Sequence, residues 1–110
     1  MYGFNVTYEI VTQESAEQGD SADSGFIAEN VPLREAIDLF QQCRTSRCDS
    51  GDGIEANESP ICAPRWFTCY NGMEYETGDY ESRSLHIPDS VTDASRRRIA
   101  RLLGLRVPRR

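Results

Sequence analysis

The stretch that most constrains the fold runs from Trp66 to Glu81, where an Asn-Gly pair lies between alternating aromatic and polar residues. Asn71-Gly72 accepts the positive φ values of a type I′ turn, so this stretch predicts a β-hairpin with a two-residue loop. Such a loop pairs Tyr70 with Met73. It places six side chains on one face of the hairpin, which we take as the core face: Trp66, Thr68, Tyr70, Met73, Tyr75 and Thr77.

The remaining regular patterns complete an α+β arrangement. Residues 2–11 alternate apolar and polar side chains and predict a strand, while residues 31–43 have apolar side chains three and four apart and predict a helix. Residues 89–105 predict a second helix, capped by Ser90 or Thr92 and ended by a glycine. Residues 81–87 predict a short edge strand. Together these patterns predict a small antiparallel sheet packed on one face by two α-helices.

At 110 residues the chain is expected to form a single domain, residues 1–110. Residues 12–30 and 44–64 are rich in small and polar residues and predict two long polar loops, and residues 107–110 predict a frayed tail. No run approaches the roughly 20 apolar residues of a membrane span. The N-terminus lacks the basic start and apolar run of a signal peptide, so we expect a cytoplasmic location.

The net charge of −6 conceals a strong asymmetry along the chain. Residues 1–81 carry a net −12, whereas residues 82–110 carry eight arginines and a net +6. An acidic body of this kind repels nucleic acid and attracts basic partners. Direct binding of DNA or RNA is therefore not the leading expectation.

The four cysteines do not have the spacing of a metal site. They follow the pattern Cys43-x4-Cys48-x13-Cys62-x6-Cys69, whereas zinc ligands usually come in tight pairs such as C-x2-C. Free thiols are the default for a cytosolic chain, and a disulfide such as Cys48–Cys62 is the alternative. We expect neither a bound metal nor a cofactor.

No pattern in the chain indicates an enzyme. His86 is the only histidine, has no adjacent cysteine, and is expected on a half-exposed edge strand. The carboxylate pairs Glu74/Glu76 and Asp49/Asp52 have no recognisable substrate cleft around them. The chain also lacks a P-loop and a G-x-G-x-x-G motif.

Two groups of residues remain as candidate binding sites. The back of the predicted hairpin and the segment after it combine acidic and aromatic side chains, a pattern that suits a protein partner: Glu74, Glu76, Asp79, Glu81, Phe67 and Tyr80. The alternative is a nucleic-acid contact through the basic C-terminal helix: Arg96, Arg97 and Arg101.

The two ends of the chain, VTYEIVTQESAEQGD and SRSLHIPDSVTDASRRRIARLLGL, resemble small uncharacterised proteins carried by bacterial plasmids, integrative elements and phages. Small acidic proteins in that setting include anti-CRISPR proteins, several of which are similar to DNA mimics. The resemblance implies a non-enzymatic inhibitor that binds a defence ribonucleoprotein, of the type I CRISPR class, and blocks its DNA binding. The alternative is a small accessory nucleic-acid-binding protein. Neither the partner nor the choice between monomer and dimer follows from the sequence.

Overall fold

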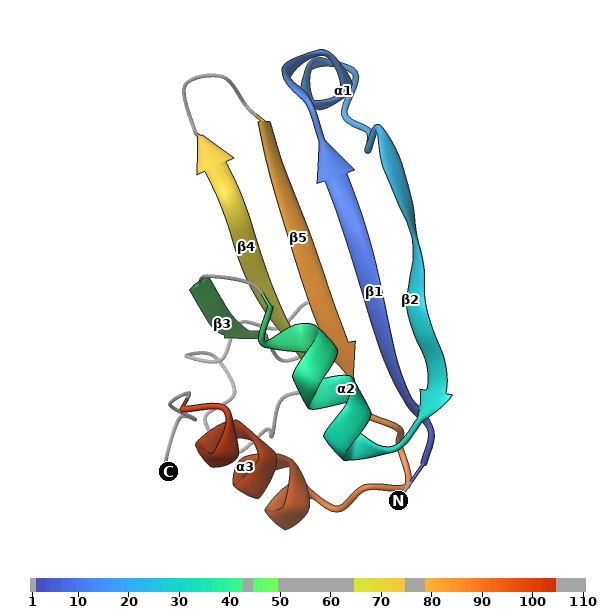
Figure 1. Cartoon of the computed structure of the whole chain (residues 1–110). Helices are drawn as coiled ribbons and strands as arrows, with labels where there is room; N and C mark the ends of the chain where they lie inside the picture. Colours follow the sequence, from blue (N-terminus) through green and yellow to red (C-terminus); the bar gives the residue numbers. More distant parts are fainter. Residues whose placement is uncertain (1, 43–44, 50–64, 75–78, 105–110) are drawn as a thin grey trace.

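The computed structural model describes residues 2–42, 45–49, 65–74 and 79–104. Within these residues the chain forms one antiparallel sheet in the strand order β2-β1-β5-β4-β3, with α2 and α3 packed on one face and α1 at the far end of the strands (Figure 1). The strands are β1 (Phe4–Val11), β2 (Asp23–Val31), β3 (Thr45–Asp49), β4 (Trp66–Glu74) and β5 (Asp79–His86). The helices are α1 (Gln13–Glu17), α2 (Leu33–Phe40) and α3 (Asp93–Leu102). The predicted α+β fold is confirmed.

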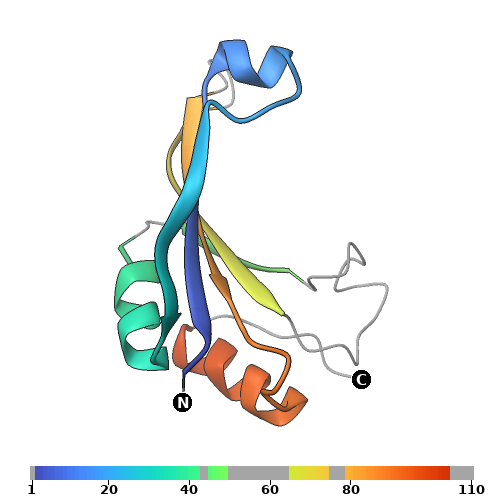
Figure 2. The same ribbon diagram turned by 90° about the vertical axis from the view of Figure 1, so that its right-hand side faces the viewer.

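The core lies between the lower half of the sheet and the two longer helices. Val6, Leu85 and Phe67 occupy one row across β1, β5 and β4, and all three are fully buried. Ile37 on α2 and Ile99 on α3 join the same cluster. Figure 2 shows the sheet edge-on, with its upper half extending beyond α2 and α3. The helices therefore cover only part of the sheet.

The predicted Asn-Gly hairpin is not formed. Asn71 and Gly72 lie within β4, and the segment that joins β4 to β5 falls in residues 75–78, outside the described part of the chain. The register shifts by one residue between the pairs Asn71↔Glu81 and Glu74↔Asp79. An extra residue in one strand produces such a shift, and glycine often marks an irregularity of this kind.

The core face of β4 is the opposite of the predicted one. Phe67 and Cys69 are fully buried in the core cluster, whereas Trp66 is only half-buried. Consecutive side chains of a strand point to opposite faces. The face of β4 that carries Phe67 and Cys69 therefore faces the helices. Trp66 pairs with His86 rather than with Thr77.

Two other predictions about the chain path are wrong. Residues 12–30 are not a loop, because they form α1 and β2. Of the predicted edge strand at residues 81–87, residues 81–86 belong to β5, which is the central strand and not an edge strand. Of the second predicted loop, residues 45–49 form β3, while residues 50–64 and the tail at 107–110 lie outside the described residues.

The helix ends follow their capping residues. Thr92 caps α3 by accepting a hydrogen bond from the Ser95 amide at 3.2 Å. Gly104 follows α3 with φ +75°, as predicted for a glycine that ends a helix. The α2 helix begins at Leu33 after Pro32, because a proline ring suits the residues just before a helix. Asn30 lies in β2 with φ +52°.

Candidate functional site

Acidic side chains gather at the end of the sheet that lies farthest from α2 and α3. This end is formed by α1, the end of β1, the starts of β2 and β5, and the end of β4 (Figure 1). Residues 1–33 and 66–82 contain no lysine or arginine. We call this end of the molecule the acidic tip, defined by Glu14, Glu17, Asp20, Asp23 and Glu81.

A short, doubly capped helix holds the tip in place. The Thr12 hydroxyl accepts a hydrogen bond from the Ser15 amide at 3.2 Å, and the Ser15 hydroxyl accepts one from the Thr12 amide at 2.8 Å. This reciprocal arrangement is a capping box. The Ala22 amide then donates to the Ile10 carbonyl at 2.9 Å, which closes the connection onto the sheet. Glu14 and Glu17 are therefore exposed on a fixed helix.

Asp23 is tied to the sheet through Tyr8. The Tyr8 hydroxyl donates a hydrogen bond to the Asp23 carboxylate at 3.2 Å, and this bond, together with the negative charge of Asp23, raises the pKa of the Tyr8 phenol. The ring of Tyr8 also lies over its strand partner Gly25, where an added Cβ would approach the ring to 3.2 Å. The glycine leaves room for this ring, which fixes the first residues of β2.

Sequence reasoning missed the contribution of α1 and β2 to this site. The polar loop predicted at residues 12–30 included Glu14, Glu17, Asp20 and Asp23. The signal that could have located α1 is the Thr12–Ser15 pair, since two hydroxyl residues three apart can cap a helix reciprocally. The strand β2 gives a weaker signal, because its apolar residues are only the short run Phe26–Ala28 and the terminal Val31.

The predicted acidic binding residues lie partly at this tip. Glu74 and Asp79 are register partners at the adjoining ends of β4 and β5. Glu81 is half-buried and lies between Ile10 and Asn71 in its row. Tyr80 pairs with Val11, and Glu76 lies outside the described residues. Backbone register thus brings Glu74, Asp79 and Glu81 to the same end of the sheet as α1.

Phe67 is not part of that surface. Its side chain is 0% exposed and packs in the core. The prediction that Phe67 contacts a partner is wrong because it depended on the turn at Asn71-Gly72. An exposed aromatic residue does occur elsewhere: Phe26 on β2 is 57% exposed.

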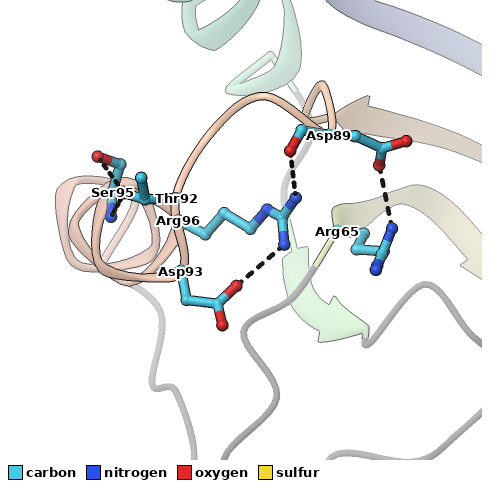
Figure 3. Close-up of polar contacts among 6 residues, drawn as sticks. All are labelled: Arg65, Asp89, Thr92, Asp93, Ser95 and Arg96. Atoms are coloured by element: carbon cyan, nitrogen blue, oxygen red, sulfur yellow. Dashed lines mark hydrogen bonds and ion pairs between the residues drawn. The ribbon is translucent and has the colours of Figure 1, made fainter.

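The basic residues lie at the opposite end, and Arg96 is not available for nucleic acid. Its side chain is 7% exposed and donates to the Asp93 carboxylate at 3.1 Å, and it also approaches the Asp89 carbonyl at 3.5 Å (Figure 3). The Arg96 Nε is buried without a hydrogen-bond partner. Arg96 therefore fastens α3 to the segment that precedes it, whereas Arg101 is exposed and Arg97 half-buried.

The face of the sheet opposite the core carries a row of hydroxyl groups beside His86. The Thr68 and Ser84 hydroxyls lie 3.1 Å apart, and His86 Nε2 lies 2.9 Å from the Thr7 hydroxyl. A hydroxyl beside an imidazole can begin a nucleophile–base pair, but that chemistry needs a third group to orient the base. Within the part of the chain that the structure describes, no carboxylate forms a hydrogen bond with His86. The contact is best understood as structural.

His86 makes the stability of the fold depend on pH. Burial lowers the pKa of His86 below 6.5, so the unfolded chain binds a proton at a pH where the folded chain does not. We expect full stability above about pH 6.5 and a falling free energy of unfolding as the pH drops from there toward the lower folded pKa. Urea unfolding at pH 7.5 and 5.5 measures this difference. In His86→Asn the difference should shrink, and an unchanged difference would contradict the assignment.

Cys69 departs from the free-thiol expectation. It is disulfide-bonded and 0% exposed. Its Sγ lies 3.4 Å from the Phe40 carbonyl oxygen, a packing contact rather than a hydrogen bond because a disulfide sulfur carries no proton. The free-thiol expectation followed from the expected cytosolic location, and this bond contradicts it for Cys69. Among the described residues, no cluster of potential ligands could hold a metal ion.

Comparison with known proteins found no matching family model, no matching curated protein and no matching solved structure. The described helices are also too short and too polar to cross a membrane.

Proposed function

We propose that the chain is a non-enzymatic inhibitor, carried by a mobile element, that uses the acidic tip to occupy a basic nucleic-acid-binding surface of a bacterial defence complex. The proposed partner is a type I CRISPR effector ribonucleoprotein, and the proposed effect is loss of its DNA binding. Effector complexes of this kind hold nucleic acid through its backbone in positively charged channels. An array of fixed carboxylates can take the place of phosphates there.

One observation carries the proposal: the carboxylates of the tip are mounted on structured elements. Glu14 and Glu17 extend from the capped helix α1, and Asp23 is held by Tyr8. Fixed charges lose less conformational entropy on binding than charges on a flexible loop. They also present a defined pattern to a basic channel and speed the encounter through electrostatic steering.

The location proposed with this function is the cytoplasm of the bacterial host, where the effector complexes act. Disulfides are rare in that compartment because thiols keep them reduced. The Cys69 sulfur is fully buried, and thiolate attack requires access to the disulfide. Burial therefore favours survival of the bond among cytosolic thiols.

The test is a DNA-binding assay with purified type I effector complex and increasing amounts of this protein. We expect the wild-type chain to release DNA, and we expect Glu14→Gln/Glu17→Gln/Asp20→Asn to require about tenfold more protein for the same effect. Three lost charge contacts of a few tenths to one kcal/mol each account for that change. Fluorescence anisotropy of a labelled DNA duplex provides the measurement.

A matched control removes the same number of charges at the other end of the molecule. Glu29, Glu35 and Asp38 are exposed and lie outside the tip, so Glu29→Gln/Glu35→Gln/Asp38→Asn has the same net charge as the tip variant. This control should inhibit like the wild type. Equal losses in both variants would indicate attraction by net charge alone, and no release of DNA by the wild type would refute the proposal.

The alternative function is nucleic-acid binding through α3. Its support is the exposure of Arg98 and Arg101 on a helix that lies far from the acidic tip. A salt-dependent gel shift that disappears in Arg97→Ala/Arg101→Ala would favour this alternative. Arg96 no longer belongs to the proposed contact, because it is buried.

A further inference from the structure

The strand β2 forms one edge of the sheet. Figure 2 views the molecule from this side and shows β2 in front, with α1 above it and α2 beside its lower half. Among the elements that the structure describes, none pairs with the outer edge of β2. An edge strand presents backbone N–H and C=O groups that can pair with another extended chain, and most proteins protect such an edge.

The lower half of β2 is protected by irregular pairing. Its register with β1 shifts twice between Phe26 and Val31. Asn30 has φ +52°, and its amide donates a hydrogen bond to the Asn5 side chain at 2.8 Å. Bulges of this kind are one of the means by which proteins blunt an exposed edge. The residues from Ile27 to Val31 are therefore poorly suited to accept another strand.

The upper half of β2 has no such protection. Its register with β1 is regular from Asp23 to Phe26, and Asp23, Ser24 and Phe26 are exposed. The strand contains neither lysine nor proline, the residues that commonly discourage pairing at an edge. This half of the strand also extends beyond α2 and α3 (Figure 2). Residues 23–26 are thus able to accept another strand.

Phe26 and Asp23 indicate which side chains an added strand should carry. Phe26 pairs with Thr7 and shares the face of the sheet opposite the core, whereas Asp23 pairs with Ile10 on the other face. Residues of an added strand would lie in the same rows as these two side chains. An apolar residue beside Phe26 would cover its ring, and a basic residue on the other face could pair with Asp23.

We infer that the upper half of β2 binds an extended segment of a partner protein, in which apolar and basic residues alternate, by adding it to the sheet as a further strand. Charge favours this partner over a second copy of the chain. Residues 1–33 contain six acidic residues and neither lysine nor arginine, so two such edges would repel each other, whereas a basic segment is attracted. The inference is separate from the proposed function, because it depends on the backbone edge of β2 and requires no carboxylate of α1.

Peptide binding tests the edge directly. The probe is a labelled peptide of about eight residues, a common strand length, in which valine and arginine alternate. The control peptide has the same sequence with its two central residues N-methylated. Because neighbouring residues of a strand direct their N–H groups to opposite edges, the control loses a ladder hydrogen bond whichever edge faces β2. We expect fluorescence anisotropy to show binding of the probe and about tenfold weaker binding of the control.

Two results of this experiment would overturn the inference. Equal binding of the two peptides would show attraction by charge alone, and no binding of the probe would show that the edge does not accept a strand. Neither result bears on the release of DNA from an effector complex, so failure here is distinguishable from failure of the proposed function.

Protein variants and amide exchange locate the bound peptide. Phe26→Ala should bind the probe up to about fivefold more weakly, which is the range for a cross-strand aromatic contact. Tyr2→Ala removes an exposed aromatic side chain away from this edge and should bind like the wild type. By NMR, amides within residues 23–26 should exchange more slowly in the complex. Equal weakening in both variants, or slower exchange confined to α1, would overturn the assignment of the edge.

A second copy of the chain is the competing occupant of this edge. We expect sedimentation to find a monomer in the absence of peptide, because the acidic edges repel each other. A dimer that dissociates in Phe26→Ala would assign the edge to self-association and would overturn the choice of a basic partner.

Discussion

Replacing Phe67 with alanine is expected to lower the free energy of unfolding by about 3–5 kcal/mol, which is the range for removing a buried aromatic side chain. Phe67 is 0% exposed and lies beside Leu85 in the central row of the core. Small domains have a total stability of roughly 5–15 kcal/mol, so this single change removes a large part of it. Urea denaturation followed by circular dichroism measures the loss.

Phe26→Ala is the matched control, because it deletes the same side chain from an exposed position. Phe26 is 57% exposed on β2, and substitutions at such sites usually change stability by about 0.5 kcal/mol or less. Both variants lose the same side chain, so the difference between their free energies of unfolding measures the effect of burial. If Phe67→Ala were as stable as the wild type, the result would contradict the burial of Phe67 and favour the surface position that the hairpin pattern predicted.

Replacing Arg96 with alanine is expected to cost about 2–3 kcal/mol. The change removes two hydrogen bonds, each worth about 1 kcal/mol in net terms, and it leaves space where the aliphatic part of a buried side chain packed. Asp93 remains solvated because its side chain is 62% exposed. The cost therefore stays below that of stranding a buried charge, which is typically about 3–5 kcal/mol.

Two further variants separate charge from packing at this position. Arg96→Met keeps the aliphatic volume and removes the buried Nε that has no partner, so we expect a change within about 1 kcal/mol of the wild type. Arg98→Ala on the exposed side of α3 should change stability by about 0.5 kcal/mol or less. Equal losses for Arg96→Ala and Arg98→Ala, measured by thermal unfolding, would show that Arg96 is not a fastening of α3.

The Arg65–Asp89 ion pair beside Arg96 contributes little to the stability of the fold. Its atoms are 3.0 Å apart, but the two side chains are 44% and 87% exposed, and exposed pairs contribute only about 0–1 kcal/mol. The backbone carbonyl of Asp89 matters more, because it faces the buried guanidinium of Arg96 (Figure 3). Burial, rather than the number of charges, decides which contact stabilises this corner.

In the stretch from Trp66 to Glu81, tertiary contacts override the structure that the local sequence pattern favours. Its alternation of aromatic and polar residues correctly indicated strands, because β4 lies within this stretch and β5 begins in it. The turn did not follow, because β4 continues through Asn71-Gly72 with a shifted register. Both faces of WFTCY carry large side chains, so periodicity alone could not choose between them. Contact with Val6, Leu85 and the helices made the choice.

By itself the sequence determined the α+β class, the strand at residues 2–11, the two longer helices and the net acidity of the chain. These features depend on local periodicity, capping residues and composition. Only the tertiary structure decided that Phe67 and Arg96 are buried and that β5 is central. It alone assembled carboxylates from α1, the segment after it and the strands β2 and β5 into the acidic tip, because side chains distant in sequence become neighbours through strand pairing. The physical reason is that register and burial are set between elements rather than within them.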